Sequence, residues 1–276
     1  EYVARKRQQE AIEAAIEWTR MFPVAAMANC GWIPKRTTIQ EKTVELLAFF
    51  GFANHRAWEE YYFNQQLKVA FRISLASTSQ PYAISAWLRM GEHQAATLHA
   101  KPYSDKAFKG VLPEIKAVMA NHPTDFFGQL QSLCAEAGVK VVHTPCLPKA
   151  PLNGSTRWMN DTPLIQLTGR HKRNDIFWFT FFHEAGHILK HGKKDIFLED
   201  VEYSDKDLEK EREADEFATE WTLSVEQETE IIESAPLDDD MIHDFAKKFN
   251  THPAIIIGRL QHRDLIHPSQ GRQFIE

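Results

Sequence analysis

The chain has 276 residues, of which 43% are hydrophobic and 25% are charged, and its formal net charge is −6 at pH 7. This composition predicts a globular protein, with no apolar run near the ~20 residues of a membrane span and no secretory signal. The acidic balance argues against nucleic-acid binding by this chain. Three widely spaced cysteines (Cys30, Cys134, Cys146) favour buried, reduced thiols and a cytoplasmic location over a disulfide framework.

The first part of the chain is predicted to be a helical region over residues 1–110. Apolar residues recur there at helical spacing in four segments. The expected helices cover residues 10–21, 38–50, 57–71 and 82–90. Gly51 follows the second of these segments and is expected to end it. The many aromatic side chains of this region are expected to form its core, and no function is assigned to it.

Residues 111–276 are predicted to form a second domain, in a helix-rich α+β fold with a small sheet. The expected helices cover residues 113–120, 125–137, 176–190, 208–223 and 241–249, with a short one opening at His252 and Pro253, and the expected strands cover residues 139–142 and 164–168. Asn174 and Asp175 are expected to cap the start of the aromatic-rich helix at 176–190, and Gly192 its end.

That aromatic-rich helix contains His183, Glu184 and His187 in the HExxH pattern. Residues four apart on a helix lie about 40° apart around the axis and ~6 Å apart along it, so both imidazoles can reach one ion. Glu184 is rotated by about 100° from His183, which places it beside the ion, as a general base for a zinc-bound water. The pattern therefore predicts a zinc site with a catalytic carboxylate.

The alternative is a helix in which the pattern occurs by chance, because the chain has 13 histidines. The phenylalanines and the tryptophan before the motif make the helix apolar on nearly every side, which predicts that it is buried. Burying two imidazoles and a carboxylate without partners is costly, and a metal ion removes that cost. The flanking residues therefore favour the zinc site over chance.

A third protein ligand is needed, and Glu211 is the preferred candidate. His191 is eight residues, or ~12 Å, from His183 along one helix, so it is expected to support a ligand or the helix end rather than bind the ion. Asp215 follows Glu211 by one turn and is expected to accept the N–H of a liganding histidine. Glu213 is the alternative ligand, and a merely solvated charged face remains the simpler explanation of the segment.

Several segments together resemble the ImmA/IrrE family of zinc metallopeptidases, above all the members that carry an N-terminal Xre/HigA-type helix-turn-helix. The resemblance covers about residues 110–265, and its segments are residues 154–158, 163–167, 177–192, 211–218 and 252–262. It implies a zincin-like, gluzincin-like metalloendopeptidase that binds zinc through His183, His187 and Glu211, with Glu184 as the base. It also implies intracellular, regulated cleavage of a protein such as a helix-turn-helix repressor, in a stress response, toxin–antitoxin control or mobile-element induction.

Two departures from the family pattern are visible. Residues 219–224 stand where family members often have an apolar stretch that ends in proline. This departure concerns helix packing or the rim of the substrate site and leaves the ligands unchanged. The helix-turn-helix module is absent from this sequence, and the missing initiator methionine suggests that the sequence is part of a longer protein.

The mode of action leaves alternatives open. The strand at 163–168 is expected to form a sheet edge that holds an extended peptide by β-augmentation. Tyr203, His252 and Arg259 are candidates for oxyanion stabilisation, although a helix cap is the ordinary explanation for His252. An active enzyme with a protein substrate is favoured over an antitoxin-type or transcription-regulating protein whose zinc domain binds partners with little turnover, because the ligands and the base are all present. No membrane partner is expected.

Overall fold

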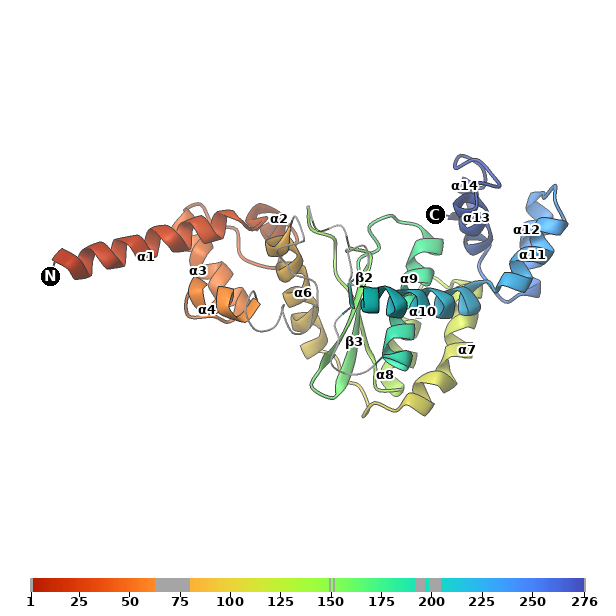
Figure 1. Ribbon diagram of the computed structural model, residues 1–276, viewed down its shortest axis with the longest axis horizontal. Helices are drawn as coiled ribbons and strands as arrows, with labels where there is room; N and C mark the ends of the chain where they lie inside the picture. The colour runs from red at the N-terminus through yellow and green to blue at the C-terminus, as the bar shows by residue number, and fades with distance from the viewer. Residues whose placement is uncertain are drawn as a thin grey trace. The chain divides into compact units, whose positions relative to one another are not determined.

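The computed structural model describes residues 2–62, 80–148, 150, 152–191, 197–198 and 205–275 (Figure 1). The chain divides into two compact units, the first comprising Glu1–Gln94 and Thr144–Pro151 and the second comprising Ala95–His143 and Leu152–Glu276. The boundary expected near residue 110 falls inside helix α7 (Asp105–Asn121), which contains Pro113 within its length. Pro113, the expected start of a helix, therefore lies in mid-helix.

The first unit is helical, as its hydrophobic spacing predicts. Its helices are α1 (Tyr2–Arg20), α2 (Val24–Asn29), α3 (Ile39–Phe50), α4 (His55–Glu59) and most of α6 (Pro81–Ala96). Thr38 and Glu41 form a capping box at the start of α3, and Gly51 ends that helix in the left-handed conformation. Buried aromatic rings such as Trp18 and Trp58 pack edge to face. The expected helix at 57–71 lies partly outside the described residues.

The second unit combines helices with a small sheet. Its elements are α7, α8 (Phe126–Glu136), β1 (Lys140–His143), β2 (Gly154–Met159), β3 (Thr162–Leu167), α9 (Asn174–Lys190), β4 (Phe197–Leu198), α10 (Asp205–Thr222), α11 (Val225–Glu233), α12 (Asp239–Lys248), α13 (Pro253–His262) and α14 (Arg272–Ile275). One hydrophobic core joins α7, α8 and α9 to the sheet and to α13. The helix-rich α+β fold predicted from the sequence is confirmed.

The strand order in the sheet is β1-β3-β2-β4. β3 pairs with β1 in parallel and with β2 in antiparallel, so it is an interior strand. Residues 163–167 are all buried. The expectation that this strand is half-exposed and serves as a peptide-binding edge is therefore wrong, because strands on both sides already use its backbone hydrogen-bonding groups.

Helix α9 carries the HExxH motif through the middle of the second unit, beside the sheet (Figure 1). Its residues from Thr180 to Ile188 are all buried, as its apolar flanks predict. Gly186 lets α10 approach closely, since a Cβ at this position would lie 3.2 Å from the Cα of Ala214. Helix α10 therefore packs against the motif.

The ends of α9 differ from the prediction. The helix begins at Asn174, after Arg173, and has no side-chain cap. The Asp175 carboxylate instead accepts two hydrogen bonds from the Arg173 guanidinium, at 3.0 and 2.7 Å. Gly192, the expected C-cap, lies outside the described residues, and His191 is the residue at the cap position.

The structure also bears on the expectations about membrane spans and about the cysteines. No helix in the described part of the chain is both long and apolar enough to cross a bilayer. Cys134 is buried as expected, whereas Cys30 is exposed and Cys146 is intermediate. The prediction of buried thiols is therefore wrong for Cys30.

Candidate metal centre

His183, His187 and Glu211 come together where α10 crosses α9. Their potential ligand atoms all lie within 4.8 Å of one another. Nε2 of His183 is 2.9 Å from Nε2 of His187 and 3.2 Å from Oε2 of Glu211. Nε2 of His187 is 3.5 Å from Oε1 of Glu211. Two turns of one helix and a carboxylate from the next helix thus converge on a single point.

The other nitrogen of each imidazole is held by a further side chain. Nδ1 of His183 lies 2.8 Å from Oδ1 of Asp215, which places the proton on Nδ1 and leaves the lone pair of a neutral ring on Nε2. Nδ1 of His187 lies 2.9 Å from Nδ1 of His191. Nε2 of His191 lies in turn 2.9 Å from Oε2 of Glu213. Both rings are therefore fixed with Nε2 facing the cluster formed by His183, His187 and Glu211.

The structure thus separates the residues that meet at the cluster from those that support it. Glu211 joins the two histidines, while Glu213, the alternative ligand, contacts His191 instead. Asp215 has the position expected for an acceptor of the His183 N–H. His191 lies behind His187 rather than among the three converging groups.

Burial and charge set the protonation of the cluster. Burial alone would lower the pKa of His183, but the hydrogen bond to Asp215 and the contacts with Glu211 and Glu184 raise it well above the usual value. Burial lowers the pKa of His187 to about 4. Burial alone would raise the pKa of Glu211, but its contacts with the two histidines lower that pKa to about 2. A metal ion that binds here must therefore replace a proton on His183.

The three groups fit a divalent zinc ion. Two imidazole nitrogens and a carboxylate oxygen form a donor set typical of catalytic zinc, and ligands ~2 Å from a tetrahedral ion lie about 3.3 Å apart. The separations of 2.9, 3.2 and 3.5 Å bracket that value. In addition, no group in the described part of the chain forms a hydrogen bond with the buried Oε1 of Glu211. A cation would satisfy this oxygen.

Glu184 lies next to the cluster but is not one of the three converging groups. Its side chain is fully buried, and its charge acts on His183. Thr156 on β2 donates a hydrogen bond to the backbone carbonyl of Glu184, at 3.1 Å. A Cβ built on Gly154, also on β2, would lie 2.8 Å from Oε1 of Glu184. The sheet therefore fixes the position of this carboxylate.

The remaining sequence candidates lie elsewhere or have structural partners. Tyr203 lies outside the described residues. The side chain of His252 accepts a hydrogen bond from the backbone N–H of Ala254 at the start of α13, which confirms its expected role as a helix cap. Arg259 lies 3.4 Å from the buried carboxylate of Glu228. These positions do not assign an oxyanion donor to either His252 or Arg259.

Residues 134–261 match the protein-family model of the IrrE N-terminal-like domain (Peptidase_M78). This stretch of the chain is similar to the ImmA/IrrE family of metallopeptidases. The match extends from α8 through α13 and includes the whole cluster and Glu184. A metallopeptidase family implies a bound metal, and His183, His187 and Glu211 are residues that could hold it. A search of curated proteins found no match.

Replacement of Asp215 by alanine is expected to weaken zinc binding by roughly 10- to 100-fold, because His183 loses the acceptor that fixes its tautomer and ring orientation. Competition with a chromophoric chelator measures this affinity. Glu216→Ala is the control, since Glu216 lies on the same helix and forms an exposed ion pair with Arg212. Equal zinc affinity of Asp215→Ala and Glu216→Ala would show that Asp215 does not support a ligand.

Sequence reasoning missed the residues of β2 that surround Glu184. Gly154 and Thr156 lie on a strand that was not predicted, because Gly154–Met159 lacks a clear alternation of apolar and polar residues. Asn160 and Asp161 are residue types that favour a hairpin turn, and they could have indicated one from the sequence. In the structure they form the turn between β2 and β3, where Asn160 adopts the left-handed conformation (φ 57°).

Proposed function

We propose that this protein is a zinc-dependent endopeptidase that cleaves a protein substrate inside the cell, such as a helix-turn-helix repressor. The observation that carries the proposal is the convergence of His183, His187 and Glu211, with Glu184 beside them and outside the cluster. A metal-binding protein without turnover has no need of the buried Glu184 carboxylate at this position. The family to which the matched domain belongs supports peptide hydrolysis as the reaction.

The proposed roles of the residues follow from their positions. His183, His187 and Glu211 would hold zinc, which supplies a Lewis acid that polarises a carbonyl and lowers the pKa of a bound water to ~7. Glu184 would take the proton from that water on its carboxylate and later deliver it to the leaving amine. Asp215 and His191 would keep the two imidazoles oriented. Burial of the motif helix excludes bulk water from these groups.

Removal of zinc with a chelator is expected to abolish cleavage of a purified repressor, and one equivalent of zinc is expected to restore it. Gel electrophoresis and mass spectrometry of the fragments provide the measurement. The repressor is identified by capture on the zinc-loaded Glu184→Gln protein, which would retain a substrate without releasing products. If the zinc-loaded wild-type protein does not cleave the proteins that Glu184→Gln captures, a binding role is favoured over the proposed enzyme.

Gly154→Ala is expected to lower the cleavage rate by roughly 10²-fold while leaving zinc content unchanged. The new methyl group would lie 2.6 Å from Cγ2 of Thr180 and 2.8 Å from Oε1 of Glu184, so the carboxylate must move. Gly128→Ala is the control, because a Cβ at this exposed helical glycine meets nothing within 4 Å. Wild-type rates in Gly154→Ala would mean that the position of the Glu184 carboxylate is unimportant for cleavage.

A further inference from the structure

A pair of histidines outside the metal cluster lies where several helices of the second unit meet. His122 ends α7 and adopts the left-handed conformation (φ 41°), and His252 caps the start of α13. Their rings lie 5.0 Å apart, centroid to centroid. The ring of His122 also stacks on Phe126 of α8 at 4.4 Å and stands edge to face with Trp178 of α9 at 6.4 Å. The pair therefore joins the start of α13 to α7 and α9.

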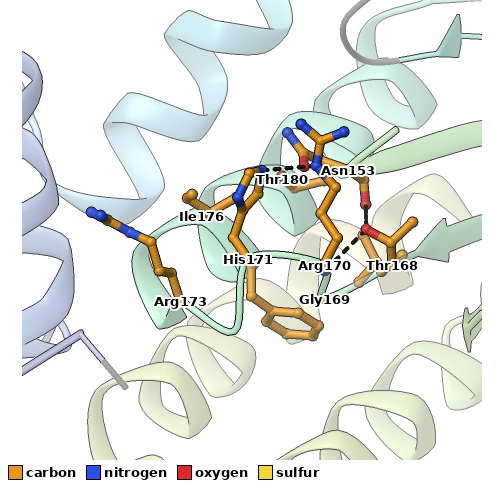
Figure 2. A pocket seen from close by; sticks show the side chains of 10 residues that line it. Asn153, Thr168, Gly169, Arg170, His171, Arg173, Ile176 and Thr180 are labelled. Carbon is orange, nitrogen blue, oxygen red and sulfur yellow. Dashed lines mark hydrogen bonds between the residues drawn. The ribbon is translucent and has the colours of Figure 1, made fainter. Parts of the chain in front are cut away.

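The start of α9 and α13 are in close contact beside this pair. A Cβ built on Gly258 of α13 would lie 2.2 Å from Oδ2 of Asp175 on α9. Arg173 binds that oxygen at 2.7 Å and the side-chain oxygen of Gln261 on α13 at 3.0 Å. Figure 2 shows Arg173 at the rim of the small pocket between β3 and α9, with its guanidinium apart from the other labelled side chains. Both helices also contribute to the hydrophobic core, so α13 supports the helix that carries the HExxH motif.

The hydrogen bonds of both rings fit a neutral imidazole and not an imidazolium. Nδ1 of His252 accepts the backbone N–H of Ala254 at 3.1 Å, so this nitrogen must carry a lone pair. Nδ1 of His122 is buried, and no group in the described part of the chain forms a hydrogen bond with it. An imidazolium carries a hydrogen on each of its nitrogens. Protonation would therefore point one hydrogen at the N–H of Ala254 and leave another buried without an acceptor.

The charges around the pair also disfavour protonation. His252 lies at the start of a helix, where the helix dipole repels a cation. Three titratable groups from other helices act on its charge: His122 of α7, His243 of α12 and Asp175 of α9. Of these three, only Asp175 would stabilise an imidazolium, and its carboxylate already accepts two hydrogen bonds from Arg173. A protonated His122 would repel a protonated His252 across 5.0 Å.

We infer that His122 and His252 form an acid-sensitive latch, which holds the start of α13 against α7 and α9 while both rings are neutral and releases it in mild acid. Protonation would remove the cap of α13 and place positive charge in the contact between these helices. The latch requires neither zinc nor peptidase activity, so it is independent of the proposed function.

The pH range of the latch follows from the surroundings of the two rings. Burial lowers the pKa of His122 below its usual value. Burial, together with the charges of His122 and His243, lowers the pKa of His252 to about 4 against the opposing charge of Asp175. A histidine released into solvent has a pKa of about 6.5. The released state therefore binds more protons, and the stability of the latch is fully present above pH ~6.5 and is lost as the pH falls toward 4.

Hydrogen exchange of the full chain, measured by mass spectrometry at pH 7 and pH 5, tests the latch. After correction for the intrinsic pH dependence of exchange, the protection of the α13 amides in wild type is expected to fall by roughly tenfold at pH 5. His252→Asn keeps a side-chain oxygen that can cap the helix but cannot titrate, so its protection should fall several-fold less. His262→Asn is the matched control, because it makes the same change at an exposed position at the end of α13 and should behave like wild type.

An equal fall of protection in wild type and His252→Asn, or no fall in wild type, would overturn the latch. NMR titration of the histidine ring signals of wild type gives a readout that holds even if His252→Asn folds poorly. His252 is expected to stay neutral as long as the α13 amides stay protected. A His252 ring that becomes protonated near pH 6.5 while α13 keeps its full protection would contradict the inference.

Discussion

Replacement of Glu184 by glutamine is expected to reduce substrate cleavage by roughly 10²- to 10⁴-fold while the protein retains one equivalent of zinc. The substitution preserves the size of a fully buried side chain but removes its ability to accept and return a proton. The zinc ligands are other residues, so metal affinity should change little. Initial rates on a captured substrate and metal analysis of the same samples provide the two measurements.

Glu216→Gln is the matched control for this experiment, because it makes the same change at an exposed position on α10. Its cleavage rate is expected to equal that of wild type. Wild-type activity in Glu184→Gln with zinc bound would remove the carboxylate from the reaction. Loss of zinc together with loss of activity would instead assign Glu184 to the metal site.

Replacement of Glu211 by alanine is expected to weaken zinc binding by at least about 10²-fold and to abolish cleavage at limiting zinc. Glu211 is the only one of the three converging groups that comes from α10, and its Oε2 and Oε1 lie 3.2 and 3.5 Å from Nε2 of the two histidines. Loss of a direct ligand should exceed the roughly 10- to 100-fold effect of losing a supporting residue. Calorimetric titration with zinc measures the difference.

Glu213→Ala separates the two acidic candidates on α10. Glu213 contacts His191, so its loss should alter the support of His187 only indirectly and weaken zinc binding much less. Greater loss of affinity in Glu213→Ala than in Glu211→Ala would reverse the proposed assignment. Circular dichroism of both variants confirms that helix content is kept.

Features encoded within a few residues could be predicted from the sequence. The start of α3 at Thr38 and the start of α13 after His252 follow from local capping chemistry. The common face of His183 and His187 follows from the helical repeat. The choice of Glu211 over Glu213 also follows from helical geometry, since Glu211 shares a face with Asp215 and both face α9.

Features that depend on distant contacts could not be predicted in this way. β3 reads as a half-exposed strand, but β1 on one side and β2 on the other enclose it, and only the pairing of separate segments decides this. Likewise, Arg170 and Thr180 contribute to one pocket because β3 turns directly into α9. Such a pocket has no sequence motif, since its residues share proximity rather than spacing.

The most direct test of the account is the zinc content of the purified chain after loading and exhaustive dialysis, measured by mass spectrometry of the metal. We predict one zinc ion per chain, held by the cluster of His183, His187 and Glu211. A properly folded protein that stays free of zinc under these conditions would contradict the account.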